Sequence, residues 1–351
     1  ADLSGRSAFV TSGYAVAGDG GGALFAKAAS EPSHPGKVQD ASGAWWEIVG
    51  PTLNVLQFGA VRNLDGSQPA TDSLQAFLDC FEAAAAIGAT VEVPIGGYLM
   101  SAALEIRHSL RIVGGSPGHG NGMTDPSGTA MHSKLHFPNG THGIFIHRAN
   151  TTIGGVEDPN DSSTGGADNV IIDGIFCQGP GGLADPALAN IERPNGFTLR
   201  ARAFLKNCRA NDFPGSGFVV SATFNSAGDV REGNANLFQM EYCSARSNGY
   251  HGLYVDGADV NAGATYSFNT TLNGGWSIWD SSFLGNVHVA PHAANDGGKG
   301  VCSWNGSRWL ALTDDTTLLT ATEPGTGPDG VWYRVDDSTF GLQAWDQRSD
   351  W

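Results

Sequence analysis

A short motif recurs five times in the chain: a glycine followed by alternating residues, of which the first and third are apolar. That alternation is the spacing of side chains on one face of a β-strand. The glycines are Gly143, Gly196, Gly217, Gly252 and Gly275, and the apolar pairs are Ile144/Ile146, Phe197/Leu199, Phe218/Val220, Leu253/Val255 and Trp276/Ile278. Self-similarity at roughly 20–50 residues indicates a solenoid, whose coils stack on one another. The motif therefore predicts stacked strands with one face in a common core.

Composition favours strands over long helices. The chain has 351 residues, 50 of them glycine, and a glycine inside a helix costs about 1 kcal/mol relative to alanine. Glycine without a Gly-X-Y period excludes collagen, and 40% hydrophobic residues exclude simple disorder. A β-sandwich would need tight hairpins joining antiparallel strands, and regular Asn-Gly hairpins are lacking. We therefore predict an all-β fold, a parallel β-helix.

Three regions are expected. Residues 1–53 form an irregular β lead-in, in which Trp45 and Trp46 pack onto the next domain rather than hold a sugar ring. Residues 54–300 form the β-helix. Residues 301–351 form a small separate β unit. Because no polar terminal cap follows the last repeat, we expect the chain to be part of a longer polypeptide.

The segment 71–88 is predicted to be a helix that caps the β-helix. Its apolar residues recur at helical spacing, Thr71 or Asp72 can cap its first turn, and Gly88 can end it. The apolar residues are Leu74, Phe77, Leu78 and Phe81. A single amphipathic helix among strands must cover the end or face of a sheet.

The formal net charge of −16 argues against a nucleic-acid partner, although a local basic cluster could meet an acidic sugar. No run of about 18 apolar residues is present, which predicts no membrane span. We expect an export leader to be absent or already removed. The five cysteines have no CxxC spacing, so they are predicted to be buried free thiols rather than zinc ligands or disulfides. Cys208 and Cys243 precede their glycines by the same distance and should stack.

Residues 54–104 resemble the opening segment of the pectate-lyase-like superfamily. The matching motifs are Phe58-Gly59-Ala60, Asp65-Gly66, Thr71-Asp72, and Pro94 with Gly96, Gly97 and Tyr98. The lead-in at 13–25 is similar to the segment that precedes such domains in phage tailspikes. The resemblance implies a right-handed parallel β-helix and membership among polysaccharide lyases, glycosidases, epimerases and tailspike depolymerases. The matched segment has no catalytic residue, so it specifies the fold and not the reaction.

Stacking the coils on their glycines places the outward residues in two columns, with neighbours about 4.8 Å apart. The first column is Phe145, Thr198, Val219, Tyr254 and Ser277, and the second is His147, Arg200, Ser221, Asp256 and Trp279. Solubility alone does not require His, Arg, Asp and Trp in one column. We therefore predict that this face binds substrate.

Asp256 and Asp280 are the predicted acid and base. The alignment brings them within about 5–8 Å, a range that overlaps both retaining and inverting glycosidases. Like charges at that distance would raise the pKa of one of them. The alternative is that these aspartates and Asp259 cap turns or bind calcium. Apart from calcium, no metal or cofactor is predicted.

An elimination reaction would use other residues, because it needs a base and a cation that neutralises a uronate carboxylate. Arg200 is the predicted cation, with Tyr254 or His251 as the base. For His251, a turn histidine with satisfied hydrogen bonds is the favoured alternative. His34 lies in the lead-in and is given no role. The remaining histidines are assigned to Gly-rich loops: His108, His119, His132, His136, His288 and His292.

Substrate binding is assigned to the other outward residues. Trp279 and Tyr254 would present flat apolar surfaces to a pyranose ring, although packing under a loop is an equal alternative. His147, Ser221 and Asp259 complete the predicted binding set.

The leading hypothesis is an extracellular or virion-associated enzyme that cleaves a complex or acidic polysaccharide on the outer face of the β-helix, by hydrolysis or elimination. The alternative is a non-catalytic glycan-binding spike, expected to be a homotrimer. A sugar epimerase or transferase on the same fold is a third option. The predicted partner is thus a polysaccharide, with no nucleic acid and no membrane.

Overall fold

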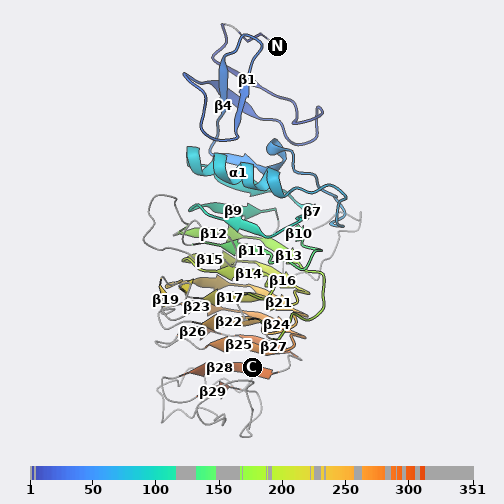
Figure 1. The fold of residues 1–351 in the computed structure, drawn as a ribbon, viewed down its shortest axis with the longest axis vertical. Coiled ribbons are helices and arrows are strands. Elements are labelled where there is room, and N and C mark those ends of the chain that lie inside the picture. Colours follow the sequence, from blue (N-terminus) through green and yellow to red (C-terminus); the bar gives the residue numbers. More distant parts are fainter. Residues whose placement is uncertain are drawn as a thin grey trace.

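The computed structural model describes residues 2–3, 5–115, 132–147, 167, 169–186, 188, 192–221, 223–224, 231–232, 235–256, 263–280, 286–289, 291–294, 298–304 and 309–312. In these segments the strands stack into a long column, with a small sheet at its N-terminal end and one α-helix beneath that sheet (Figure 1). Three long sheets, here called A, B and C, build the column. Successive coils add a strand to A, then B, then C, so the fold is the predicted parallel β-helix.

The strands of the three sheets follow in order from the N-terminal end. Sheet A contains β5 (Thr52–Asn54), β6 (Thr90–Val93), β9 (Arg111–Gly114), β12 (Val170–Asp173), β15 (Ala203–Lys206), β20 (Gln239–Glu241), β23 (Ala264–Tyr266) and β26 (Val287–Val289). Sheet B contains β7 (Gly96–Leu99), β10 (Ser133–His136), β13 (Ile175–Gln178), β16 (Arg209–Asn211), β21 (Ser244–Arg246), β24 (Asn269–Thr271) and β27 (His292–Ala294). Sheet C contains β8 (Leu104–Ile106), β11 (Ile144–Ile146), β14 (Phe197–Leu199), β17 (Phe218–Ser221), β22 (Leu253–Asp256), β25 (Trp276–Asp280), β28 (Gly298–Trp304) and an antiparallel last strand, β29 (Trp309–Leu312).

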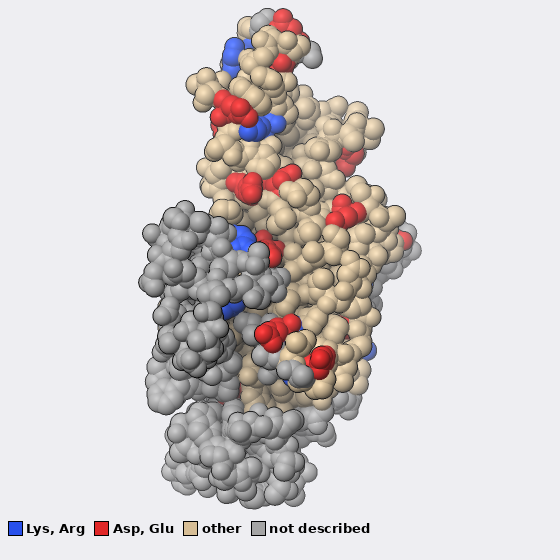
Figure 2. Space-filling model, in the orientation of Figure 1, with Lys and Arg blue, Asp and Glu red and all other residues tan. Residues whose placement is uncertain are grey.

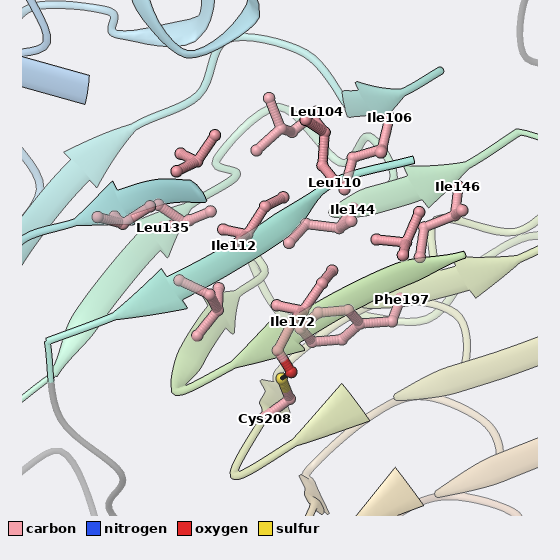
Figure 3. Packing of buried hydrophobic residues seen from close by; sticks show 14 of the residues in the cluster. Leu104, Ile106, Leu110, Ile112, Leu135, Ile144, Ile146, Ile172, Phe197 and Cys208 are labelled. Atoms are coloured by element: carbon pink, nitrogen blue, oxygen red, sulfur yellow. Dashed lines mark hydrogen bonds between the residues drawn. The ribbon is translucent and has the colours of Figure 1, made fainter. Parts of the chain in front are cut away.

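The interior of the column is filled by residues that alternate inward from all three sheets, and Figure 3 shows them converging between the strands. In sheet C, Ile144 pairs with Phe197, which pairs with Phe218, as predicted. The rings of Phe197 and Phe218 stack with centroids 4.9 Å apart. Because burying such a side chain contributes about 1.5–3 kcal/mol, this inner column fixes how the coils stack.

The fifth repeat does not follow the predicted register. Leu253 pairs with Ile278 and not with Trp276, so β25 is shifted by two residues relative to the glycine alignment. Leu253 and Ile278 are 25 residues apart, and the same offset already joins Gln239 to Ala264 in sheet A and Ser244 to Asn269 in sheet B. The whole coil therefore sets this register, whereas Gly252 and Gly275 are only 23 residues apart. At the corner before β25, His251 Nδ1 accepts a hydrogen bond from the Trp276 N–H at 3.0 Å. A Cβ on Gly275 would come within 2.7 Å of the same ring. Gly275 therefore packs on the histidine instead of stacking on the preceding repeat's glycine.

The corner between sheets A and B is a residue in the left-handed conformation. Asn207 (φ 50°), Tyr242 (φ 53°) and Ser267 (φ 50°) occupy it in successive coils. Such a φ costs a non-glycine residue about 1–2 kcal/mol. Each of these residues donates its N–H to the next coil, as Tyr242 does to the carbonyl of Tyr266 at 3.0 Å. The stacking of coils therefore holds the strained corner in place.

The corner between sheets B and C contains a ladder of buried asparagines. Asn248 and Asn273 are each 2% exposed. Asn248 Oδ1 accepts from the Phe213 N–H at 3.0 Å, and Asn273 Oδ1 accepts from the Asn248 N–H at 3.1 Å and from its Nδ2 at 2.8 Å. These bonds satisfy backbone groups that the corner would leave unpaired, and they link successive coils.

The lead-in is an antiparallel sheet of four strands, β1 (Ala8–Val10), β2 (Leu24–Lys27), β4 (Trp45–Ile48) and β3 (Lys37–Gln39), paired in that order. Trp46 is fully buried and packs edge-on against Phe9, so it supports its own sheet. Trp45 is partly buried, with Lys37 Nζ 5.5 Å from its ring. Both contacts are with the lead-in itself and not with the domain that follows.

The predicted capping helix is α1 (Leu74–Ile87), which lies between the small sheet and the coils (Figure 1). It begins later than the sequence suggested, and Asp72 Oδ1 accepts from the Leu74 N–H at 3.1 Å at its start. It ends at Gly88, whose φ is +71°. Phe77 and Phe81 are buried beneath it, as predicted. A single 3-10 turn, η1 (Val55–Phe58), precedes it.

Four cysteines are buried free thiols, as predicted: Cys80, Cys177, Cys208 and Cys243. Cys208 and Cys243 stack, because the residues that follow them, Arg209 and Ser244, are register partners. Apart from β28 and β29, the predicted C-terminal unit at 301–351 lies outside the described residues. The short strands β18 (Thr223–Phe224) and β19 (Arg231–Glu232) pair antiparallel, and the residues between them are likewise not described. No helix in the described part of the chain is long and apolar enough to cross a membrane.

Candidate functional site on sheet C

The outer face of sheet C carries the predicted columns, with one change that follows from the shifted strand. The register places Glu105, Phe145, Thr198, Val219, Tyr254 and Trp279 side by side. Trp279 thus moves from the second column to the first, beside Tyr254. In the second column, Ser221 pairs with Asp256, as predicted. His147 and Arg200 are neighbours too, because the Arg200 N–H donates to the carbonyl of Ile146 at 3.0 Å.

An aromatic cluster occupies the C-terminal half of this face. The ring of His251 stacks on Tyr254 with centroids 5.6 Å apart and lies 5.5 Å from the ring of Trp279. The ring centroids of Trp276 and Trp279 lie 6.2 Å apart. Tyr254 and His251 are partly exposed, whereas Trp279 is only 3% exposed. The partly exposed rings of Tyr254 and His251 can therefore contact a sugar, whereas Trp279 is covered and packs beside them.

The surroundings of His251 set both its charge and its tautomer. Burial and the positive charge of Arg193 lower the pKa of His251 to about 3, so the ring is neutral at neutral pH. Its Nδ1 accepts the Trp276 N–H, which leaves the ring proton on Nε2. A neutral imidazole has one basic nitrogen, which in His251 is Nδ1, and this atom already accepts the hydrogen bond from the Trp276 N–H. The structure therefore supports the turn-histidine alternative, and His251 can offer only an N–H to a ligand.

A cation not identified from the sequence lies beside this cluster. The guanidinium of Arg193 sits 3.7 Å from the ring centroid of Tyr250 and donates to the carbonyl of Pro186 at 3.1 Å. The Tyr250 hydroxyl in turn donates to the carbonyl of Ala184 at 3.2 Å. Arg193 is partly buried and close enough to His251 to lower its pKa. It is thus a positioned positive charge at the edge of the aromatic cluster.

A second polar group lies at the N-terminal end of the face. Glu105 forms ion pairs with Arg107 and, at 3.5 Å, with His147. Partial burial raises the pKa of Glu105, but the hydrogen bonds from His147 and Arg107 outweigh this and hold the pKa below its usual value. The side chains of Glu105 and Arg107 are 27% and 22% exposed. An ionised carboxylate is therefore accessible here, four strands and about 19 Å from position 256.

Asp280 was wrongly placed on the outer face. It pairs with Val255, an inward residue, and is 1% exposed. Its Oδ2 lies 3.1 Å from His288 Nε2 and accepts from Asn286 Nδ2 at 3.0 Å. His288 Nδ1 lies 2.9 Å from the hydroxyl of Thr265, also in the interior. Asp280 thus belongs to a buried polar cluster, and it cannot pair with Asp256 across a substrate.

Three other predicted contacts are buried. His147 is 0% exposed, Ser221 is 1% exposed and Arg200 is 7% exposed. The ring of His147 packs at 4.4 Å on that of Phe145. In this conformation these residues support the face and do not present a surface to a sugar.

The side chains of two predicted aspartates lie outside the described part of the chain. Asp256 is the last residue of β22, and its backbone pairs with that of Ser221 in the second column. Asp259 lies outside the described residues. No group of three or more His, Cys, Asp and Glu side chains in the described residues could hold a metal ion.

The residues that sequence analysis missed have no glycine motif before them. Glu105 lies on β8, where Ala103 stands in the position of the repeat glycine, although Leu104 and Ile106 show the same alternation. A search for two apolar residues flanking one other residue, without the preceding glycine, would have found Glu105. Arg193 lies in the connection before β14, and no local pattern marks it.

No protein-family model and no curated protein matches the chain. Similar solved structures include the catalytic domain of Agl-KA, with 16% identity, a TM-score of 0.43, and 74% of this chain and 50% of that chain covered. WceF of Pantoea stewartii, a glycan biofilm modifying enzyme with a tailspike-like parallel β-helix fold, has 13% identity, a TM-score of 0.39 and coverage of 90% and 52%. Tailspike gp49 of Acinetobacter baumannii bacteriophage Fri1, a capsular polysaccharide depolymerase, has 12% identity, a TM-score of 0.42 and coverage of 86% and 59%. The chain spans about half the length of these proteins.

Proposed function

We propose that this protein binds an acidic polysaccharide on the C-terminal half of the outer face of sheet C and cleaves it there by β-elimination. The observation that supports the proposal is the gathering of Arg193, His251 and Tyr254 about β22, the strand whose last residue is Asp256. These groups supply a cation, a hydrogen-bond donor, a phenol and a carboxylate. Elimination needs a cation against the uronate carboxylate, a base and an acid.

Each group has a role in this scheme. Arg193 pairs with the uronate carboxylate and stabilises the charge that develops when the adjacent C–H loses its proton. Asp256 takes that proton, the electron pair forms the C=C bond, and the glycosidic C–O bond breaks. Tyr254 donates its hydroxyl proton to the leaving oxygen. Residues two apart on one strand face lie about 7 Å apart, which leaves room for the sugar ring between the base at 256 and the acid at 254.

The carboxylate pair expected for hydrolysis does not lie on the outer face of sheet C. A glycosidase pair needs two carboxyl groups about 5–9.5 Å apart. The predicted partner of Asp256, Asp280, is interior. Among the described strands of sheet C, the other outward carboxylate is Glu105, about four strand spacings away.

The test is digestion of a panel of acidic polysaccharides, followed by ultraviolet absorbance of the unsaturated product and by reducing-end assay. Asp256→Asn and Tyr254→Phe should each lower turnover by about 10²–10⁴. Glu105→Gln, on the same face but remote from the cluster, should keep turnover. Near-wild-type turnover in both cluster variants, with folding intact, would refute the assignment. New reducing ends without absorbance would indicate hydrolysis instead.

Binding without cleavage is the alternative outcome. Saturable binding to a polysaccharide with no new reducing ends after long incubation would make the protein a glycan-binding spike. We also propose that the protein is extracellular or virion-associated and that it forms a homotrimer. Sedimentation equilibrium of the full-length protein would test the oligomeric state.

A further inference from the structure

A cavity of about 310 Å³ lies where the lead-in sheet meets the capping helix, at the other end of the column from the cluster on sheet C (Figure 1). Its walls come from the loop at 11–21, from β2, β3 and β4, from the turn η1 and from α1. The side chains that could contact a ligand there are those of Tyr14, Phe25, Lys37, Gln57, Phe58 and Asp79. Small-molecule sites span about 300–1,000 Å³, so this cavity suits a ligand of about one sugar ring.

Tyr14 is an exposed aromatic residue that the fold holds in place. Its side chain is 61% exposed, but its N–H donates to Asp19 Oδ1 at 3.0 Å, and the same carboxylate accepts from three further N–H groups of the loop. A Cβ on Gly59 would come within 2.6 Å of the tyrosine ring, so the glycine lets the ring lie against the backbone. The Tyr14 hydroxyl forms no hydrogen bond with any described residue. A fixed, exposed ring with an unused hydroxyl therefore borders the cavity.

The charged groups of the cavity have hydrogen-bonding capacity left over. Lys37 Nζ donates to Glu31 Oε1 at 2.7 Å and to the carbonyl of Pro32 at 2.8 Å, which leaves one of the ammonium protons for a ligand. Asp79 Oδ1 accepts from Gln75 Nε2 at 2.8 Å, and Asp79 Oδ2 accepts from no described residue. A donor on the lead-in sheet and an acceptor on the helix thus line the same cavity.

This combination of groups favours a neutral sugar over an anion or an apolar molecule. Lys37 is already paired with Glu31, and the protein has a formal net charge of −16, with acidic side chains scattered over the surface seen in Figure 2. The cavity therefore has no positive excess to attract an anion. An apolar ligand would remove water from the ammonium and the carboxylate without replacing its hydrogen bonds, which costs free energy. A pyranose has apolar C–H faces for an aromatic ring and hydroxyls at its edge for both charged groups.

We propose that this cavity is a second glycan-binding site, in which a pyranose ring stacks on Tyr14 and its hydroxyls bond to Lys37 and Asp79. Phe25 and Phe58 form the apolar walls. The site binds one sugar unit and does not cleave it. Holding a polysaccharide at a second point keeps long chains on the protein while the cluster on sheet C acts on them. This consequence rests on the proposed function, whereas sugar binding itself does not.

The test is saturation-transfer NMR of the full chain with methyl β-glucopyranoside, methyl β-galactopyranoside, N-acetylglucosamine and glucuronate, each titrated separately. At least one of these pyranoses should bind saturably, and open-chain sorbitol, which has no flat ring face, should not. Binding of phenol but of no sugar would show an apolar site and overturn the proposal. No saturable binding of any pyranose in the panel would also overturn it.

Replacing the aromatic ring tests the stacking contact. Tyr14→Ala should weaken binding of the pyranose about 3- to 10-fold, because the ring contact is lost, and Tyr14→Phe should keep most of the affinity. Tyr266→Ala is the matched control, since Tyr266 is an exposed tyrosine on β23, far from the lead-in. Equal weakening in Tyr14→Ala and Tyr266→Ala would show nonspecific contact and refute the site.

Replacing the carboxylate separates binding from stability. Asp79→Ala should weaken binding about 10-fold, because a hydrogen bond to a charged group is lost. Alanine is the better helix former, so this variant should melt at nearly the same temperature as the wild type. Glu82→Ala removes an exposed carboxylate from the same helix outside the cavity and should leave binding unchanged. Unchanged binding in both Asp79→Ala and Tyr14→Ala would overturn the site.

The two sites can be told apart by their variants. Sugar binding that is lost in Tyr254→Ala and kept in Tyr14→Ala would place the sugar on sheet C and overturn the lead-in site. If the protein cleaves polysaccharide as proposed, Tyr14→Ala should raise KM for long chains and leave kcat and the cleavage of short oligosaccharides unchanged. An unchanged KM for long chains would overturn the anchoring role. Sugar binding that depends on Tyr14 in a protein that cleaves nothing would support this site and refute only the proposed function.

Discussion

The asparagine ladder gives a prediction that can be worked from individual hydrogen bonds. The Asn248 side chain accepts from the Phe213 N–H at 3.0 Å and donates to the carbonyl of Ala210 at 3.1 Å and to Asn273 Oδ1 at 2.8 Å. All of this lies at a corner where Asn248 is 2% exposed. Asn248→Ala removes these three bonds and leaves the Phe213 N–H without its partner. At about 1 kcal/mol for each of the two bonds that the amide donates, and about 1–3 kcal/mol for the unsatisfied Phe213 N–H, the free energy of unfolding should fall by about 3–5 kcal/mol.

The assay is urea unfolding followed by circular dichroism, with tryptophan fluorescence as a second probe for the cooperativity that a solenoid can lose. Asn139→Ala is the matched control, because Asn139 makes one exposed side-chain bond, to the carbonyl of Ser101 at 2.8 Å. It should change the free energy of unfolding by less than about 0.5 kcal/mol. If Asn248→Ala lowers the free energy by less than about 1 kcal/mol, the ladder does not hold the coils together and the reasoning is wrong.

The remaining predictions concern the interior and the buried histidines. Asp280→Ala should lower the free energy of unfolding measured in urea by about 3–5 kcal/mol, because it leaves the buried His288 without the carboxylate. Loss of activity without loss of stability would contradict this and indicate a catalytic role for Asp280. Burial lowers the pKa of His136 and of His142 from 6.5 to about 4, and of His251 to about 3. The unfolded chain therefore binds more protons below pH 6.5, and stability should be full above that pH and fall as the pH drops toward 4. His142→Gln should reduce that slope, and a pH-independent midpoint between pH 7 and 4.5 would contradict the assignment.

Most of the architecture could be predicted from local pattern. The alternation after Gly143, Gly196, Gly217 and Gly252 gave the correct inward residues, because a strand has a side-chain period of two and a buried face must be apolar. The capping helix followed from helical spacing and from Gly88, whose left-handed φ ends it. These features depend on a few neighbouring residues, so they can be predicted from the sequence alone.

The candidate site was less predictable, because it depends on contacts between coils. Asp280 was placed outward, yet alternation from the outward Trp279 already turns it inward, and its hydrogen bonds come from a later coil. The glycine alignment gave β25 the wrong register, because this coil is offset by 25 residues in all three sheets whereas Gly252 and Gly275 are 23 residues apart. Aligning Asn248 with Asn273 would have given the correct pairing.

Local sequence pattern is enough to predict a parallel β-helix with an N-terminal helical cap, because periodic burial and turn chemistry depend on neighbouring residues. Which outward residues meet and which are covered is known only from the folded coils. The physical reason is that both depend on the register of one coil on the next, which residues distant in the sequence set together.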